Sequence, residues 1–98
     1  MRIRFHPEAY TEMFESALYY ERRVEGLGLD FLAAVQQTTN HIRTFPEGGA
    51  KVYADVRRRL VAGFPFSIMY RIRKDGIFVT AVMYQGRKPG YWRKRLKD

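Results

Sequence analysis

Residues 64–84 read FPFSIMYRIRKDGIFVTAVMY, two apolar runs separated by the tripeptide Lys74-Asp75-Gly76. Both runs are rich in β-branched and aromatic residues, a composition typical of strands. An Asp-Gly pair between two such runs is a strong hairpin signal, because these residues tolerate the backbone conformation that a tight turn requires. The stretch therefore predicts an antiparallel hairpin.

A third strand-like run, DVRRRLV at residues 55–61, precedes this hairpin and is separated from it by Ala62 and Gly63. Three consecutive runs with short breaks predict an antiparallel meander. Alternation along the middle strand places one set of side chains on one face, Phe66, Ile68, Tyr70 and Ile72, and another on the opposite face, Ser67, Met69, Arg71 and Arg73. We expect the first face to be covered by helices and the second to be open and basic.

The first half of the chain has a helical period instead. After Pro7, which suits the first turn of a helix, apolar residues recur three and four apart: Tyr10, Met13, Phe14, Ala17, Tyr20 and Val24. Gly26 and Gly28 are predicted to end this helix, and Asp30 to cap a second one. The second stripe is Phe31, Val35, Thr38, Ile42 and Phe45, and Pro46 ends it. Residues 2–6 alternate like a short strand, and residues 46–51 are interpreted as a loop.

Together these patterns predict one α+β domain over residues 1–98. It comprises an N-terminal strand, an α-helical hairpin and a three-stranded antiparallel meander, with the helices packed on one face of the twisted sheet. No apolar run approaches the roughly 18 residues of a membrane span, and the N-terminus lacks a signal-peptide pattern. The absence of cysteine fits a reducing compartment. We expect a cytoplasmic protein with no membrane partner.

Charge is distributed unequally between the two halves of the chain. The formal net charge is +8, but residues 51–98 alone carry 13 basic and 3 acidic groups, a net of +10. Such a basic half attracts polyanions or acidic protein surfaces in a salt-dependent way. Charge alone does not identify the anion.

Common catalytic and cofactor motifs are missing from the sequence. His6 and His41 lie in separate predicted elements, so no set of three or four metal ligands is expected. Neither GxxxxGK[ST] nor GxGxxG occurs. Glu12 and Glu15 are interpreted as the solvated flank of a helix and not as an acid–base pair. We therefore expect neither a metal nor a cofactor.

The arginines of the predicted sheet have two interpretations. Arg57 and Arg59 share one face of their strand, and Arg58 takes the opposite face beside Leu60. Charge of this kind commonly keeps an edge strand soluble. Alternatively, Arg57 and Arg59 join Arg71, Arg73 and Arg87 in a basic patch that binds phosphates or an acidic protein.

The chain ends with RKPGYWRKRLKD at residues 87–98. Tyr91 and Trp92 either stack on nucleic-acid bases among the cations or fold back to cover the end of the sheet. We favour the second interpretation for the single tryptophan of a small domain. The basic residues that follow are then expected to form an exposed last turn: Arg93, Lys94, Arg95 and Lys97.

The ordered set of these features resembles the RelE/ParE superfamily of type II toxin–antitoxin toxins, and most closely its ParE-like, plasmid-stabilisation branch. The resemblance covers essentially the whole chain and is carried by ALYYERRVEGLGLDFL at 17–32, GFPFSIMYRI at 63–72, the KDG turn, IFVTAVMYQGRKPGYW at 77–92 and the basic tail. It implies a small basic toxin that is neutralised by a cognate acidic antitoxin. RelE-like members cleave messenger RNA on the ribosome without a metal, whereas ParE-like members inhibit DNA gyrase.

Individual positions partly separate the two branches. Residues that match the basic and aromatic positions of the RNase branch are Arg57, Arg59, Arg87 and Tyr91, with Trp92 as an alternative aromatic. Ser67, however, stands where that branch carries an arginine, and a serine cannot neutralise a phosphate. Losing one preorganised donor commonly costs about 100- to 1000-fold in rate. Residues 84–87 also read Tyr-Gln-Gly-Arg where the ParE-like branch often has His-x-x-Arg.

The resemblance thus implies a ParE-like toxin that binds a macromolecular target, with DNA gyrase expected for the branch, and that is not itself an enzyme. The residues expected to contact the target or antitoxin are Arg57, Arg59, Arg71, Arg73, Arg87 and Trp92. Two alternatives stay open. One is a metal-independent, ribosome-dependent mRNA endonuclease that uses Arg57, Arg59, Arg87 and Tyr91. The other is a degenerate member that retains only antitoxin binding.

Overall fold

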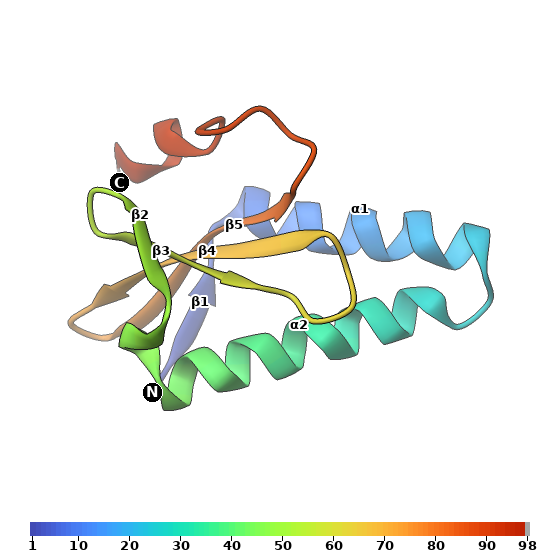
Figure 1. The fold of residues 1–98 in the computed structure, drawn as a ribbon, viewed down its shortest axis with the longest axis horizontal. Coiled ribbons are helices and arrows are strands. Elements are labelled where there is room, and N and C mark those ends of the chain that lie inside the picture. The colour runs from blue at the N-terminus through green and yellow to red at the C-terminus, as the bar shows by residue number, and fades with distance from the viewer. Residues whose placement is uncertain (98) are drawn as a thin grey trace.

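The computed structural model describes residues 1–97, and its centre is a five-stranded mixed sheet with strand order β1-β5-β4-β3-β2 (Figure 1). The strands are β1 (Ile3–Phe5), β2 (Ala50–Tyr53), β3 (Val56–Leu60), β4 (Phe66–Arg73) and β5 (Gly76–Tyr84). β1 pairs parallel with β5, and the other neighbours pair antiparallel. The predicted α+β class and the meander of β3, β4 and β5 are confirmed.

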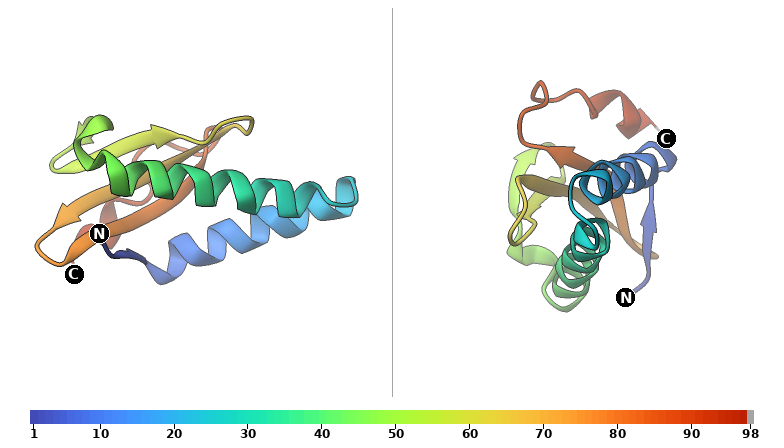
Figure 2. Two further views of the ribbon diagram at one scale, coloured as in Figure 1. Left: turned by 90° about the horizontal axis from the view of Figure 1, so that it is seen from below. Right: turned by 90° about the vertical axis from the view of Figure 1, so that its right-hand side faces the viewer.

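Two helices, α1 (Pro7–Arg23) and α2 (Leu27–Thr44), form the predicted hairpin and cover one face of the sheet, here called the helix face (Figure 2). The connection between the two helices differs from the expected one. Asp30 lies inside the first turn of α2, and Gly26 is the N-cap residue with a φ of 86°. The side chain of Glu21 accepts hydrogen bonds from the backbone N–H groups of Gly26 and Gly28, both at 2.9 Å. A carboxylate from α1 therefore satisfies the free N–H groups at the start of α2.

The main core lies between the helices and the helix face. Its buried residues include Phe31, Val35 and Ile42 from α2, together with Ile68 and Tyr70 from β4. The buried Tyr70 hydroxyl donates to the carbonyl oxygen of Pro46 at 2.7 Å and accepts from a backbone N–H at 3.1 Å. Both partners belong to the segment after α2, which contains a 3₁₀ turn, η1 (Pro46–Gly48).

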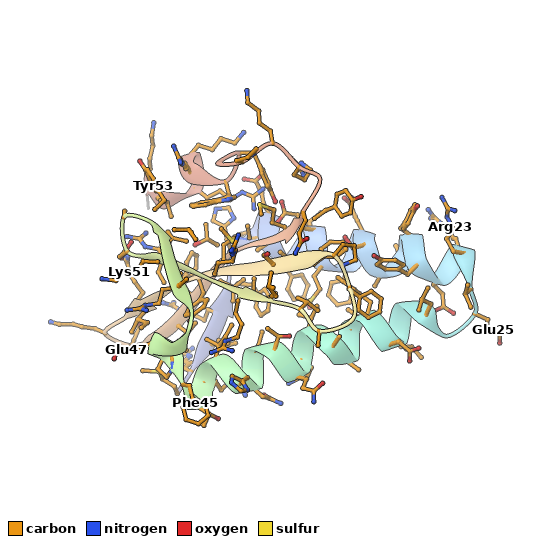
Figure 3. The ribbon with its side chains drawn as sticks, viewed as in Figure 1. Arg23, Glu25, Phe45, Glu47, Lys51 and Tyr53 are labelled. Atoms are coloured by element: carbon orange, nitrogen blue, oxygen red, sulfur yellow. The ribbon has the colours of Figure 1, made fainter. Side chains whose placement is uncertain are left out.

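Two expectations about the helices and the loop were wrong. Tyr10, Phe14 and Val24 belong to the predicted stripe of α1 but are exposed, and Phe45 projects into solvent at the end of α2 (Figure 3). The segment interpreted as a loop continues into β2, an edge strand whose four residues are all exposed. β2 was missed because a strand without a buried face has no alternating pattern.

The second face of the sheet, here called the outer face, is not open as expected. A C-terminal segment, residues 85–97, crosses this face and ends in a 3₁₀ helix, η2 (Arg93–Lys97) (Figures 1 and 2). Trp92 packs there against Val56, Met69 and Ala81, one residue from each of three strands. The favoured interpretation of Trp92 as a cover for the sheet is therefore confirmed.

Candidate functional site

A groove of about 570 Å³ lies between the outer face and the C-terminal segment. We call it the outer groove. It is lined by Val52, Tyr53, Arg58, Leu60, Ser67, Met69, Met83, Gln85, Arg87, Pro89, Gly90, Trp92 and Arg93. These lining residues include three arginines and neither Asp nor Glu, so the groove is a cationic surface with an apolar floor.

The three arginines reach the outer groove from different elements. Arg58 lies on β3 opposite Met69, so its side chain is directed to the outer face. Within residues 1–97, Arg58 forms no ion pair or side-chain hydrogen bond. The guanidinium of Arg87 stacks on the ring of Tyr91 at 3.8 Å, and that of Arg93 on Tyr53 at 4.0 Å. Stacking leaves the N–H groups at the edge of a guanidinium available to an anion.

The floor of the outer groove holds two further polar atoms. Ser67 Oγ and Trp92 Nε1 are both buried, and neither has a hydrogen-bond partner among the described residues. Unpaired buried polar atoms are uncommon in folded proteins, and each one calls for an explanation. Both atoms lie below the surface of the groove, so the groups that face a bound acid directly are the three guanidiniums.

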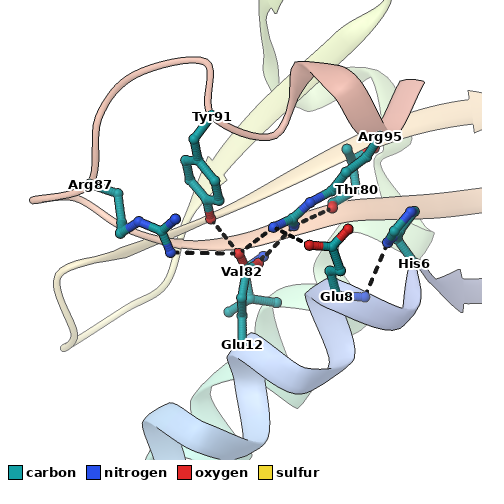
Figure 4. Close-up of polar contacts among 8 residues, drawn as sticks. All are labelled: His6, Glu8, Glu12, Thr80, Val82, Arg87, Tyr91 and Arg95. Carbon is teal, nitrogen blue, oxygen red and sulfur yellow. Dashed lines mark hydrogen bonds and ion pairs between the residues drawn. The ribbon is translucent and has the colours of Figure 1, made fainter. Parts of the chain in front are cut away.

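The C-terminal wall of the outer groove is attached to α1 through Glu12 (Figure 4). The Glu12 carboxylate accepts hydrogen bonds from the Tyr91 hydroxyl at 2.7 Å and from the Val82 backbone N–H at 3.0 Å. It also accepts two from Arg95, at 2.8 and 3.1 Å. Arg95 donates in addition to the Thr80 carbonyl oxygen at 3.1 Å. Helix, strand edge and C-terminal segment thus meet at one side chain.

Burial makes this network electrostatically strong. The side chains of Arg95 and Glu12 are only 5% and 14% exposed. Burial alone lowers the pKa of Arg95, but its bonds to Glu12 outweigh this, so the pKa is raised and the residue stays charged. Burial, and then the bond to Glu12, raise the pKa of Tyr91, so its hydroxyl stays protonated and donates. Removing one member of such a buried pair leaves the other uncompensated.

The predicted basic patch is divided between the two faces of the sheet. Arg57 lies on the helix face, where it donates to the carbonyl oxygens of Glu47 and Gly49 at 2.9 and 2.8 Å. Arg59 also lies on the helix face and lines a cavity of about 290 Å³ beside α2. The expectation that these two arginines join Arg71, Arg73 and Arg87 on one open surface was wrong.

The other expected site residues also differ in their surroundings. Arg71 lies on the outer face and pairs with Asp55 at 3.0 Å, while Arg73 is exposed at the end of β4. Trp92 is 3% exposed, so it lines the outer groove as part of its floor and does not project from it. Of the expected residues, the outer groove contains only Arg87 and Trp92.

The constellation expected for RNA cleavage is not assembled. Arg57 and Arg59 lie on the helix face, whereas Arg87 and Tyr91 lie together on the opposite side of the sheet. Within the described residues, no group of three or more His, Cys, Asp or Glu side chains is positioned to hold a metal ion. No helix in this part of the chain is both long and apolar enough to cross a membrane.

Sequence reasoning missed four residues of this region. Arg58 was expected on the face opposite the basic patch, but it lies on the outer face, and Arg93 was assigned to an exposed last turn. Arg95 was expected to be exposed, yet it is buried on Glu12, which was interpreted as a solvated flank. The excess of cations near the C-terminus could have indicated that one of them pairs with an acidic residue elsewhere in the chain. The sequence does not indicate which acidic residue that is.

Comparison of the chain with known protein families and with curated proteins finds no match. Function must therefore be argued from the residues and their geometry.

Proposed function

We propose that this chain is the toxin of a type II toxin–antitoxin pair, resembling the ParE-like branch of the RelE/ParE superfamily, and that it inhibits growth by binding a macromolecular target. The outer groove is the proposed binding site. The observation that carries the proposal is its set of three arginines, Arg58, Arg87 and Arg93, without an acidic residue in the lining. The resemblance names DNA gyrase as the expected target and a cytoplasmic acidic antitoxin as the partner.

Binding suits the outer groove better than cleavage does. A metal-independent cleavage site needs groups that abstract a proton and stabilise a charged intermediate at fixed positions. Ser67 occupies the floor, and the lining contains no His, Asp, Glu or Lys side chain. Arginine remains protonated at all ordinary pH values, so it binds anions well but is a poor base. Ribosome-dependent RNA cleavage is therefore the second candidate function. The third candidate is a degenerate member that has lost toxicity and retains only antitoxin binding.

Induced expression in a bacterial host tests the proposal. We expect growth arrest with the wild-type chain and relief by Arg58→Glu, which reverses a charge in the outer groove. Arg22→Glu is the matched control, because Arg22 is an exposed arginine of α1 that does not line the groove. This control should arrest growth like the wild type.

The nature of the lesion separates the candidates. Double-strand DNA breaks with an induced SOS response support gyrase as the target. Transcript 5′ ends that map to fixed codon positions would replace the proposal with RNA cleavage. Absence of growth arrest by the wild-type chain, at a confirmed level of folded protein, would leave only the degenerate alternative.

A further inference from the structure

Glu12 belongs to the helix side of the molecule, yet its carboxylate contacts the segment that forms the wall of the outer groove (Figure 4). It reaches that segment around the edge of β5. β1 pairs with β5 only at residues 77–79, so the edge of β5 beyond Val79 is not covered by a strand. Glu12 occupies this edge by accepting the Val82 N–H at 3.0 Å. A backbone group of the sheet thereby fixes the carboxylate in place.

A continuous series of contacts connects this carboxylate to the outer groove. Glu12 Oε2 accepts the Tyr91 hydroxyl at 2.7 Å, and the Tyr91 ring lies under the guanidinium of Arg87 at 3.8 Å. Arg87 Nη1 is itself 4.0 Å from Glu12 Oε2. Arg87 in turn lines the outer groove. The direction of one of the three groove arginines is therefore set by an acidic side chain outside the groove.

The same carboxylate also fixes the other end of the C-terminal wall. Its two hydrogen bonds to Arg95 hold η2 against the sheet, and η2 begins at Arg93, directly after Trp92. Trp92 and Arg93 supply the floor and the third cation of the outer groove. Besides these bonds, Arg95 donates to the Thr80 carbonyl oxygen at 3.1 Å and pairs with Glu8 at 3.6 Å. Trp92 and Leu96 pack on the outer face, and Arg93 stacks on Tyr53. Glu12 is the acceptor that joins both Tyr91 and Arg95.

We propose that Glu12 is a positioning residue for the outer groove, holding Arg87, Trp92 and Arg93 in the arrangement that binds an acidic partner. The inference rests on the proposed function, because it concerns the same site. This positioning role and the charge of Glu12 predict opposite effects of a Glu12 substitution on the binding of an acidic ligand. Removing a negative charge next to a cationic site should strengthen the binding of an acidic ligand by Coulomb's law, whereas loss of positioning weakens it.

Two isosteric variants separate these effects. Glu12→Gln and Glu15→Gln each remove one negative charge from α1, and both glutamates line the same cleft of about 560 Å³ between α1 and the edge of β5. Glu15 forms no ion pair or hydrogen bond among residues 1–97. Binding of a fluorescently labelled deca-glutamate peptide is measured for both. We expect Glu12→Gln to bind about tenfold more weakly than the wild type, which corresponds to roughly 1.4 kcal/mol, and Glu15→Gln to bind equally or slightly more tightly.

Trp92 provides a second readout that is independent of the ligand, because it is the only tryptophan of the chain. Glu12→Gln should shift its fluorescence emission to longer wavelength and increase its quenching by acrylamide, as the indole becomes exposed. Glu15→Gln should leave both unchanged. Tyr91→Phe provides a milder test in case Glu12→Gln does not fold. It removes the hydrogen bond between Tyr91 and Glu12 and keeps the ion pair between Arg95 and Glu12. It should weaken peptide binding in the same direction but less.

The outcomes distinguish the inference from the proposed function. Unchanged Trp92 emission in folded Glu12→Gln, or peptide binding as tight as in the wild type, overturns the positioning role. If Tyr91→Phe and Glu12→Gln both bind more tightly, electrostatics governs and the inference is wrong. If the wild-type chain itself neither binds the peptide nor arrests growth, the proposed function fails, and the positioning role in binding fails with it.

Discussion

The phenol hydroxyl of Tyr91 donates to the carboxylate of Glu12 at 2.7 Å, and this pairing makes the stability of the protein sensitive to alkaline pH. Burial and the bond to Glu12 raise the pKa of Tyr91 above its ordinary value of 10.0. The unfolded chain therefore loses this proton at a lower pH than the folded chain. A group of this kind stabilises the folded state below the unfolded pKa, and the contribution is lost as pH rises towards the folded pKa.

We predict that the free energy of unfolding falls as pH is raised above 10, and that the fall is smaller in Tyr91→Phe. The variant should be less stable than the wild type at pH 8, and the difference should narrow as pH increases above 10. Urea unfolding at several pH values measures it. The pKa of Tyr20 is also raised by burial, but Tyr20 is present in both proteins, so the comparison isolates Tyr91. A difference that stays constant above pH 10 would contradict the assignment.

For individual residues, the sequence predicted which side chains share a face of a strand, but it did not predict which residues they contact. Strand alternation correctly placed Arg57 and Arg59 on one face and Arg58 on the other. It did not show which face would be covered, because that depends on where the C-terminal segment lies. Glu12 and Arg95 are 83 positions apart in the chain, and no local pattern links residues at that distance.

The two helices of the hairpin approach each other closely at Gly28. A Cβ atom added at Gly28 would lie 2.4 Å from the backbone carbonyl oxygen of Ala17. Real side chains do not approach a backbone oxygen this closely, so the helices would have to move apart. The glycine that was interpreted as a helix terminator is therefore a contact residue inside α2.

We predict that Gly28→Ala destabilises the protein by about 1–3 kcal/mol, as overpacking in a core commonly does. Helix propensity alone predicts the opposite sign, a gain of roughly 1 kcal/mol for alanine over glycine. Chemical denaturation measures the change, with Gln36→Ala at an exposed position of α2 as the control. That control should stay within about 0.5 kcal/mol of the wild type. A more stable Gly28→Ala variant would show that the helices do not meet at this residue.

The helices and strands that have a clear apolar pattern could be predicted from the sequence, and those without such a pattern could not. β4 and β5 contain long apolar runs bounded by a turn, and both helices have a helical period, so their existence followed from the sequence. β2 is short and has no buried residue, and η2 is mostly basic, so neither presents an apolar pattern. The helix period also overestimated burial, because Tyr10 and Phe14 lie at the edge of the stripe and remain exposed.

At the scale of the whole molecule, the sheet separates two apolar clusters of unequal size. Among residues 1–97, the larger cluster lies under the helices and contains 12 buried residues, whereas the outer cluster contains Val56, Met69, Ala81 and Trp92. The C-terminal segment covers the outer cluster with Trp92, Tyr91 and Leu96. The C-terminal segment therefore has two roles: its apolar side chains cover the outer cluster, and its arginines supply cations to the outer groove.

We predict that a chain ending at Gly86 keeps the helices and the larger cluster but exposes the outer cluster. Deleting the residues after Gly86 removes Trp92, and loss of a buried tryptophan alone commonly costs about 3–5 kcal/mol. The shortened chain should show native-like circular dichroism in the far ultraviolet, a lower free energy of unfolding and binding of a hydrophobic dye to Met69 and its neighbours. A chain ending at Leu96 is the control, because it retains Trp92 and Arg95 and should behave like the wild type. Equal stability and no dye binding in the Gly86 chain would mean that the segment does not pack on the outer face in solution.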